Sequence, residues 1–187
     1  MVCFGMRLIT KRLILRPIRL GDAAAFFEHA SHPDVPRFGG FPAPRSIADT
    51  RKTVRRMTAE WKKRGPKRMA FAILLKREGT WIGGTSLRWP HSGVGEIGYG
   101  LSPRYRGNGY ATEAARALVD LAFRKFGAHR VQATCWVKNP RSESVLRKAG
   151  FRKEGRLRGF LKQGEKVRDE FVFGITRPDW KRKTARR

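Results

Sequence analysis

The sequence is short of acidic residues and of cysteine. The chain of 187 residues has 15 Asp and Glu residues against 42 Lys and Arg residues, which gives a formal net charge of +27. A field of that size attracts polyanions and repels cations, so it informs on partners rather than on fold. The two cysteines, Cys3 and Cys135, have neither the spacing of a zinc site nor that of a disulfide framework. This shortage is typical of a protein of the reducing cytoplasm.

Long apolar segments are absent as well. The longest apolar run, residues 69–75, is far shorter than the roughly 20 residues that a membrane-spanning helix needs. The first residues contain Arg7, Lys11 and Arg12 and no apolar stretch of signal-peptide length. We therefore expect a soluble, cytoplasmic protein without a membrane segment and without a bound metal. The histidines, which lack the spacing of a metal-ligand set, are His29, His32, His91 and His129.

The length predicts one domain that buries about two-thirds of its unfolded surface. We expect this domain to cover residues 1–180 and a basic tail to cover residues 181–187. Nine basic residues and one acid lie between Arg51 and Arg68, and six more basic residues lie between Arg177 and Arg187. Each run alone is typical of a solvated surface. Together they favour contact with a polyanion such as rRNA, and the second run, which lies beyond the last expected strand, is expected to contribute nothing obvious to the core.

A strand, a basic glycine loop and a helix follow one another between residues 96 and 126. Residues 96–101 are typical of a strand, and the loop is Arg104-Tyr105-Arg106-Gly107-Asn108-Gly109. Two glycines one residue apart let backbone amides point outward, and the helix start adds about half a positive charge. The spacing excludes a P-loop, and a dinucleotide fingerprint would need a third glycine where Thr112 stands. The segment is therefore typical of a different phosphate cradle.

The rest of the chain alternates between expected strands and helices. Asp22 and Ser46 stand where they can cap helices that run to His32 and to about Arg64. Residues 32–45 hold four prolines and two glycines and are typical of a loop. A further helix is expected over residues 142–148. The expected strands are residues 8–18, 70–75, 80–87, 94–101, 130–137, 151–161 and 166–175. This order predicts an α/β (α+β) domain with a mixed, mostly antiparallel seven-stranded sheet flanked by helices.

Several segments together resemble one enzyme family. The Arg104-x-x-Gly107-x-Gly109 loop resembles the pyrophosphate loop of GNAT-superfamily acetyltransferases, which bind acetyl-CoA. Asn139-x-x-Ser142, a short helix and Gly150-Phe151 resemble the RimJ/RimL-like branch, which acetylates ribosomal-protein N-termini. Similar strands of that branch correspond to residues 10–16, 96–99 and 168–173. The resemblance covers about residues 8–180 and implies a single-domain GNAT fold, splayed at the centre of its sheet around acetyl-CoA.

The resemblance also implies how acetyl-CoA is held. Backbone groups of Tyr99, Gly100 and Leu101 would align the pantetheine and donate to the oxyanion of the tetrahedral intermediate, where one N–H can lower the barrier by ~3 kcal/mol. Asn139 and Ser142 would lie beside the pantetheine arm and the sulfur. Each loop arginine would add charge to the pyrophosphate, or could equally be a solvated side chain. The residues expected at the pyrophosphate are Arg104, Arg106, Gly107, Asn108, Gly109, Ala111 and Thr112.

The expected chemistry is direct attack of a neutral amine on the thioester, without an enzyme nucleophile. Glu96 is the candidate base because alternation places it on the face of Gly98 and Gly100, but it could equally be a structural carboxylate. The Ser142 hydroxyl could protonate the departing thiolate or cap its own helix. Cys135 shares a strand face with apolar neighbours, which favours a buried structural thiol.

These features predict an acetyl-CoA-dependent N-acetyltransferase whose acceptor is the N-terminal α-amine of a protein such as a ribosomal one. A small amine, such as an antibiotic or polyamine, is one alternative, and a basic ribosome- or RNA-binding protein without turnover is the other. Phe38 and Phe41 lie where the family's chain overhangs the acceptor site, so they are either lid residues or a seal over the core. A polycationic acceptor would need a local acidic pocket, for which the candidates are Glu28, Asp34, Glu96 and Asp169.

Overall fold

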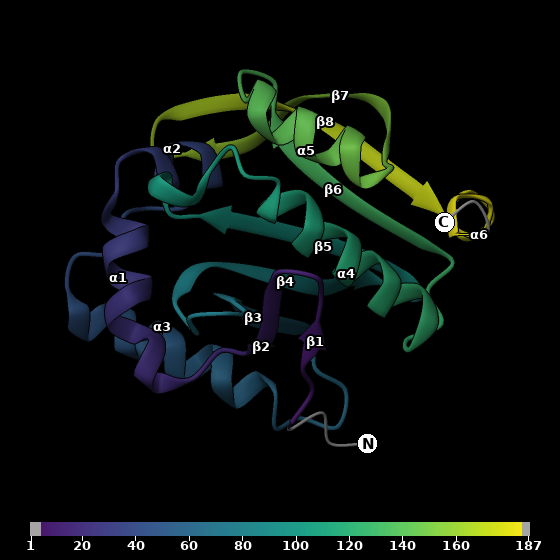
Figure 1. Cartoon of the computed structure of the whole chain (residues 1–187). Coiled ribbons are helices and arrows are strands. Elements are labelled where there is room, and N and C mark those ends of the chain that lie inside the picture. The colour runs from purple at the N-terminus through teal and green to yellow at the C-terminus, as the bar shows by residue number, and fades with distance from the viewer. Residues whose placement is uncertain (1–4, 185–187) are drawn as a thin grey trace.

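The computed structural model describes residues 5–184, which form one mixed sheet with helices on both faces (Figure 1). The sheet has eight strands in the order β1-β2-β3-β4-β5-β6-β8-β7. All neighbouring strands are antiparallel except β5 and β6. The strands are β1 (Leu8–Ile9), β2 (Leu13–Pro17), β3 (Arg68–Leu75), β4 (Trp81–His91), β5 (Val94–Leu101), β6 (Arg130–Trp136), β7 (Arg152–Gln163) and β8 (Lys166–Thr176). The expected mixed, mostly antiparallel architecture is confirmed.

The helices separate onto the two faces because strand side chains alternate. On β3, Phe71 and Ile73 belong to the main core, which includes Leu118 of α4, whereas Ala70 belongs to a second cluster with Val54 of α3. Figure 1 shows α4 lying across the sheet, with α1 and α3 together at its edge. The helices are α1 (Ala23–Ser31), α2 (Asp34–Gly39), α3 (Ile47–Glu60), α4 (Tyr110–Arg124), α5 (Pro140–Ala149) and α6 (Arg177–Thr184), with short 3-10 turns η1 (Leu20–Asp22) and η2 (Pro103–Tyr105).

In the described chain, β5 and β6 pair only where they begin. Val94 to Glu96 face Arg130 to Gln132 in parallel register, and beyond that point the two strands part (Figure 1). On its other side β5 stays paired with β4 as far as Leu101. The edge of β5 that faces β6 therefore carries N–H and C=O groups without a strand partner, which an extended ligand can use. The expected central splay is present, and it opens a cleft in the sheet.

The expected N-terminal strand is broken into a hairpin. The backbone N–H of Thr10 donates to the carbonyl of Leu13 at 2.9 Å, and its hydroxyl donates to Glu113 of α4 at 2.6 Å. The hydrogen bonds between Thr10 and Leu13 are local and compete with continuous strand pairing, and the bond to Glu113 fixes the turn on α4. The chain therefore turns at residues 10–12, β1 pairs with β2, and the sheet has eight strands rather than the expected seven.

One of the two expected helix caps is confirmed. The Ser46 hydroxyl accepts the backbone N–H of Asp49 at 3.1 Å at the start of α3. Asp22 precedes α1 but makes no capping bond to it. Its carboxylate instead accepts two hydrogen bonds from Arg16, at 2.6 and 2.8 Å, and the backbone N–H of Arg19 at 2.7 Å. A buried charge is better satisfied by a guanidinium than by a cap alone.

Residues 32–45, expected to be a loop, contain the short helix α2. Two prolines, Pro33 and Pro36, lie before and within its first turn, where the missing N–H groups have no partner in a helix anyway. The helix ends at Gly40, which adopts a φ of +71°, the left-handed conformation typical of a helix terminus. Proline and glycine therefore mark the ends of this helix rather than excluding it.

The basic segment after β8 is also helical and joins the core. Trp180 of α6 is 8% exposed, lies against Phe123 of α4 with ring centroids 5.1 Å apart, and donates its indole N–H to Asp120 at 2.6 Å. The expectation that this segment contributes nothing to the core is wrong. The expected boundary at residue 180 falls inside α6, and residues 185–187 lie outside the described chain.

Candidate active site

The glycine loop between β5 and α4 has the backbone shape of an anion cradle. Gly107 and Gly109 have φ values of +85° and +78°, in the left-handed region that favours glycine. A side-chain carbon added at Gly107 would meet no atom within 4 Å, so the space above it is open. Gly109 immediately precedes α4, whose first residues Ala111 and Thr112 line the same cleft. Open N–H groups and a helix start therefore converge, as the phosphate prediction requires.

An arginine from the other end of the chain holds this loop in place. Arg12, just before β2, donates to the carbonyl of Asn108 at 2.9 Å and lies over the ring of Tyr110 at 4.6 Å. Its backbone N–H and its Nε both donate to Glu113 at 2.8 Å. Burial alone would raise the pKa of Glu113, but the hydrogen bonds from Thr10 and Arg12 lower it below its usual value. Sequence reasoning assigned Arg12 only to a strand, because nothing in its neighbourhood signals this long-range contact.

The two loop arginines have different surroundings. Arg104 lies over the ring of Tyr105, 4.9 Å from its centroid, and neither it nor Asn108 is among the residues that line the cleft. Arg106 does line it, and donates to Asp34 of α2 at 2.7 Å and to the carbonyl of Leu101 at 3.2 Å. Arg106 thus ties α2 to the glycine loop, and a bound pyrophosphate would compete with Asp34 for its guanidinium.

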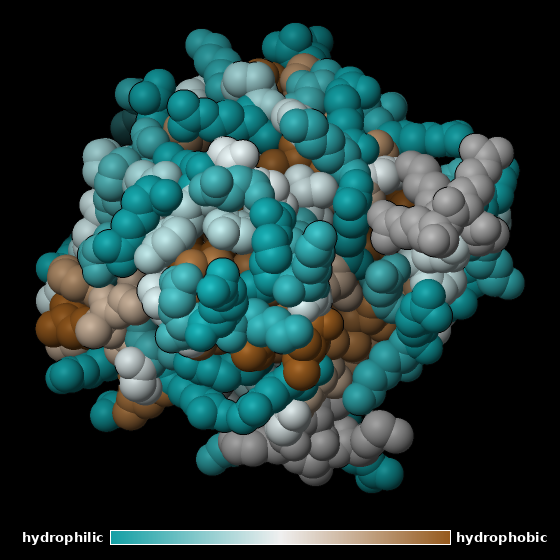
Figure 2. Space-filling model, viewed as in Figure 1, coloured by the Kyte–Doolittle hydropathy of each residue, from teal (hydrophilic) through white to brown (hydrophobic). Residues whose placement is uncertain are grey.

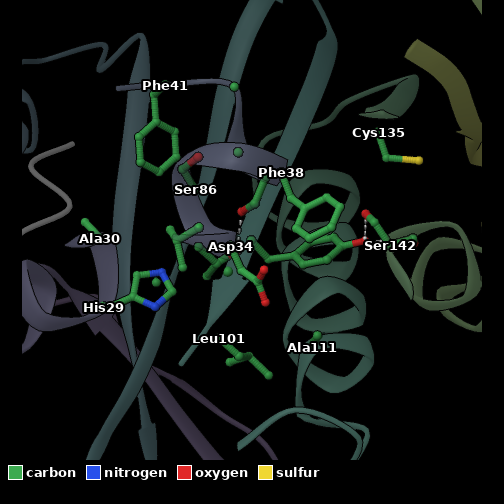
Figure 3. A pocket seen from close by; sticks show the side chains of 18 of the residues that line it. His29, Ala30, Asp34, Phe38, Phe41, Ser86, Leu101, Ala111, Cys135 and Ser142 are labelled. Atoms are coloured by element: carbon green, nitrogen blue, oxygen red, sulfur yellow. Dashed lines mark hydrogen bonds between the residues drawn. The ribbon is translucent and has the colours of Figure 1, made fainter. Parts of the chain in front are cut away.

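β5 presents its predicted backbone groups at the cleft. Tyr99, Gly100 and Leu101 all line it. A side-chain carbon at Gly100 would lie 3.1 Å from Nε2 of His29, so the imidazole packs directly over this glycine. Burial, with the nearby charge of Arg106, lowers the pKa of His29 to about 4, and the ring is therefore neutral at physiological pH. His29 closes the α1 side of the cleft (Figure 3).

α5 carries the two residues expected beside the pantetheine. Asn139 caps this helix, because its Oδ1 accepts the backbone N–H of Ser142 at 3.1 Å. The alternative that Ser142 caps the helix is therefore wrong. The Ser142 hydroxyl, labelled in Figure 3, lies 3.0 Å from the Tyr99 hydroxyl. Burial raises the pKa of Tyr99 well above its ordinary value, so its hydroxyl keeps its proton.

Glu96 and Cys135 have partners that limit their chemistry. Both oxygens of Glu96 accept hydrogen bonds: Oε1 from Arg88, including one from Nε at 2.9 Å, and Oε2 from Gln132 at 3.1 Å. Cys135 is 5% exposed, and burial together with the charge of Glu170 raises its pKa to about 11. A thiol with that pKa is not a nucleophile at neutral pH.

The cleft also extends between α2 and the β7–β8 hairpin, and we call this part the proposed acceptor half. Phe38 of α2 packs toward Trp136 of β6 with ring centroids 5.9 Å apart, and Phe41 lies higher on the same wall (Figure 3). Gln163 of the hairpin donates to the carbonyls of Pro36 and Phe41 at 3.0 and 3.3 Å. Phe38 and Phe41 both line the cleft, so they form its overhanging wall.

Arg168 and Glu170 of β8 also line this half, and sequence reasoning did not select either as a site residue. Glu170 is 3% exposed, and burial raises its pKa. The acids considered for an acceptor pocket were instead Glu28, Asp34, Glu96 and Asp169, of which only Asp34 and Glu96 line the cleft among the described residues. Strand alternation was the sequence signal that could have separated these two residues, because Glu170 and Asp169 point to opposite faces of the sheet.

The cleft as a whole has a volume of about 1860 Å³. Hydrophilic side chains cover most of the surface around it, with apolar patches toward the middle of the view (Figure 2). Among residues 5–184, no three His, Cys, Asp or Glu side chains are grouped as a metal site would require, and Cys3 lies outside that range. No described helix is both long enough and apolar enough to span a bilayer.

Comparison with known proteins assigns the family. The acetyltransferase (GNAT) domain model matches residues 12–152, and the chain belongs to this family. It is 33% identical over 171 residues to the uncharacterized N-acetyltransferase YoaA of Bacillus subtilis, covering 90% of this chain and 96% of that one. It is 32% identical over 84 residues to the ribosomal protein uS5-alanine N-acetyltransferase of Escherichia coli, covering 45% of this chain and 43% of the relative.

A solved structure extends this likeness to the fold. The RimJ protein of Mycobacterium smegmatis, in complex with CoA-disulfide, aligns with 89% of this chain and 83% of its own at a TM-score of 0.80 and 26% identity. The chain is therefore an acetyl-CoA-dependent N-acetyltransferase with the GNAT fold. The expected family, fold and enzyme class are confirmed.

Proposed function

We propose that this enzyme acetylates the N-terminal α-amine of a protein, and that ribosomal proteins are its acceptor class. The observation that carries the proposal is the size of the cleft. Its volume of about 1860 Å³ exceeds the roughly 300–1,000 Å³ typical of a site for one small ligand. The cleft has room for acetyl-CoA beside the glycine loop and for an extended chain segment under the wall formed by Phe38 and Phe41. A small amine would leave much of this volume to water.

The relatives support the same acceptor class. The Escherichia coli relative is named for the alanine of ribosomal protein uS5, and the matched structure is a RimJ protein that holds CoA-disulfide. The segments of this chain that resemble that branch, residues 139–151 and 168–173, are α5 and β8, which both lie on the β6 side of the splay. They border the place where the acceptor meets the thioester.

In this proposal the donor half holds acetyl-CoA chiefly through backbone groups. The pyrophosphate lies in the cradle of Gly107 and Gly109 at the start of α4. The pantetheine runs along the unpaired edge of β5, with Asn139 and Ser142 on the facing helix. An N–H of the stretch from Tyr99 to Leu101 donates to the oxyanion, a contact worth about 3 kcal/mol of barrier. The cosubstrate supplies the activated acetyl group, and the protein supplies orientation.

The hydroxyl pair of Ser142 and Tyr99 is proposed to serve the departing sulfur. Ser142 can give a proton to the thiolate while Tyr99, 3.0 Å away, donates to the serine oxygen. Since Asn139 already caps α5, the Ser142 hydroxyl has no structural task at the helix start. Glu96 was predicted as the base that takes the proton of the amine, and this stays a prediction. Its hydrogen bonds to Arg88 and Gln132 oppose that role.

Surface charge would bring the enzyme to its acceptor. α3 exposes Arg51, Lys52 and Arg55, and α6 exposes Lys181 and Arg182. A ribosomal protein presented beside rRNA lies in a negative field, which a chain of charge +27 approaches readily. A polyamine would have to approach against repulsion.

An acceptor screen tests the proposal. Peptides with free N-termini copied from ribosomal proteins, the same peptides with blocked N-termini, and a panel of small amines are each incubated with acetyl-CoA, and thiol release is measured. We expect turnover with free peptides and none with blocked peptides that lack lysine. Turnover confined to small amines would overturn the acceptor class and favour the small-molecule alternative. Acetyl-CoA binding without turnover on any acceptor in the screen would favour the non-catalytic alternative.

A further inference from the structure

Glu170 lies on the acceptor side of the splay, one strand away from the gap. In the register of β6 and β8 it stands opposite Trp136. Trp136 shares a face with Gln132 because alternate strand residues point the same way, and Gln132 pairs with Glu96 of β5. Glu170 and Thr134 therefore continue the sheet face that forms the floor of the cleft, and both line it. A carboxylate thus stands beside the place where β5 and β6 part.

One oxygen of this carboxylate has no hydrogen-bond partner. The Glu170 side chain is 5% exposed, and its Oε1 lies 2.9 Å from Nε of Arg168. The N–H is not directed at that oxygen, so neither atom makes a hydrogen bond. The Nη1 and Nη2 atoms of Arg168 instead donate to the carbonyls of Arg37 and Phe38 in α2, at 2.8 and 3.3 Å. Arg168 thus gives Glu170 a positive neighbour while its directed hydrogen bonds go to the overhanging wall.

A buried oxygen that is ion-paired but makes no directed hydrogen bond needs an explanation. Leaving such an atom without a hydrogen bond costs about 1–3 kcal/mol, so most buried polar atoms in proteins are paired. Burial raises the pKa of Glu170, against the opposing effects of Arg168 and of the Thr134 hydroxyl. Two other acids of the cleft differ, because Asp34 and Glu96 are each hydrogen-bonded to an arginine. Glu170 therefore combines a raised proton affinity with a buried oxygen that has an ion-pair neighbour but no directed hydrogen bond.

We propose that Glu170 docks the acceptor amine and takes its proton before attack. This rests on the proposed acetyl transfer to an amine and gives Glu170 the role predicted for Glu96. An ammonium N–H donates to the Glu170 carboxylate at the cleft, and the proton passes to that carboxylate. The nitrogen lone pair then attacks the thioester carbon, and the carbon–sulfur bond breaks with its electrons on sulfur. The second proton lost by nitrogen ends on sulfur, and the proton on Glu170 returns to solvent.

The groups around Glu170 fit an amine with an apolar stem. Trp136 of β6 and Phe38 of α2 form an aromatic wall, and the guanidinium of Arg168 lies 5.4 Å from the Trp136 ring centroid. Thr134 is the hydroxyl neighbour on β6, and the buried thiol of Cys135 on the same strand keeps its proton. Arg168 is the cation that acts on Glu170, and α2 holds it in place. A neutral amine is favoured over an ammonium once the wall excludes water, which assists the proton transfer.

The test compares Glu170→Gln with Glu165→Gln, which changes an exposed glutamate on the same hairpin. The acceptor is whichever amine the enzyme turns over, peptide or small, so failure of the acceptor class leaves this test intact. We expect kcat/KM for the acceptor at pH 7 to fall about 100-fold in Glu170→Gln, the size of a general-base contribution. We expect raised pH to restore it in part. The Kd for acetyl-CoA should stay within about twofold of wild type, and Glu165→Gln should behave as wild type.

A merely structural Glu170 predicts a different result. Loss of a buried ion pair lowers the melting temperature and reduces both acetyl-CoA binding and turnover, without changing the shape of the pH profile. Acceptor kcat/KM within about threefold of wild type, or a pH profile of unchanged shape, would overturn the proposal. Glu170→Asp keeps the carboxylate at shorter reach, and recovery of at least tenfold over Glu170→Gln is expected. If Glu170→Gln fails to fold, the test uses the acidic limb of the pH profile of kcat/KM for Glu170→Asp. An unshifted acidic limb together with wild-type kcat/KM would overturn the role of Glu170 as the base.

Discussion

The donor half and the acceptor half of the cleft use different parts of the polypeptide. Most of the proposed donor half is one continuous stretch, β5, the glycine loop and the start of α4, which offers backbone N–H and C=O groups, and α5 adds Asn139 and Ser142. The proposed acceptor half combines α2, β6 and the β7–β8 hairpin, and it offers side chains such as Glu170, Arg168 and Phe38. A backbone site tolerates many sequences provided its glycines remain. Side chains can change from one relative to another, so the acceptor can differ while the donor stays the same.

The largest effect should come from adding a side chain to the donor cradle. Gly107→Glu puts a carboxylate at a φ of +85° where the phosphates are expected, so acetyl-CoA affinity should fall at least about 100-fold through repulsion and blockage. Gly79→Glu is the matched control, since this glycine also has a positive φ, +69°, and open space, but lies in the turn between β3 and β4. Calorimetric titration measures both. Equal affinities of the two variants would show that the donor half does not depend on this backbone.

His29, packed between α1 and Gly100, should make stability depend on pH. The pKa of His29 is about 4 in the folded protein and 6.5 in the unfolded chain. The contribution of the neutral imidazole to the unfolding free energy is therefore complete above pH 6.5 and is lost as the pH falls toward 4. Between pH 7.5 and 4.5 the unfolding free energy of wild type should drop about 2.5 kcal/mol more than that of His29→Gln. Urea unfolding at the two pH values measures this. His91→Gln, at an exposed histidine, should match wild type; a wild-type loss equal to that of His29→Gln would contradict the assignment.

Substitution of Ser142 tests the hydroxyl pair that it forms with Tyr99 between α5 and β5. Ser142→Ala should lower kcat about tenfold while leaving the Kd for acetyl-CoA nearly unchanged, because the lost contact matters only as the thiolate departs. Ser144→Ala, on the same helix, is the control. Glu96→Gln separates the two candidate bases: since Arg88 and Gln132 hold Glu96, we expect less than about a threefold change. Wild-type turnover of Ser142→Ala from pH 6 to 9 would remove the acid role.

Substitutions on the basic surface of α3 should have the smallest effect on catalysis in the cleft. Changing Arg51, Lys52 and Arg55 to Gln should leave turnover on a free peptide unchanged. It should make ribosome binding less salt-dependent, by about 0.7–0.9 log units in affinity per lost phosphate contact for each tenfold change in salt. Filter binding over a salt series measures the slope. Lys11, Lys76 and Arg77, exposed at the opposite end of β2 and β3, give a control triple with the same charge change. Equal slopes for the two triples would mean that α3 has no special contact.

The donor half could be located from the sequence because its signals are local. Gly107 and Gly109, a strand before them and a helix after them all lie within one short segment, and their backbone conformations agree with the expectation. Ser142 and Asn139 of α5 also line the cleft, and the helix cap is Asn139. Even in this half the sequence did not predict the long-range contacts, because the ion pair of Arg12 and Glu113 joins residues that are far apart in the chain.

The acceptor half could not be predicted in the same way because it depends on register. Glu170 and Asp169 are neighbours in sequence, and only the pairing of β8 with β6 decides which of them faces the cleft. Arg168 contacts carbonyls of α2, a helix hidden in a proline-rich segment that was expected to be irregular. Trp180 shows the same limit, since the charges around it suggested a solvated tail. In each case the deciding partner is remote in the chain.

The position of β8 in the sheet has a consequence for the way the protein is made. The strand lies between β6 and β7, although it follows both in the chain. During synthesis, which proceeds at roughly 5–20 residues per second from the N-terminus, the donor half is complete while residues of β8 are still missing. The β7–β8 hairpin must then dock on β6 as a unit, and it brings Arg168 and Glu170 with it. A growing chain can therefore assemble the cradle for acetyl-CoA before it possesses the wall that receives the amine.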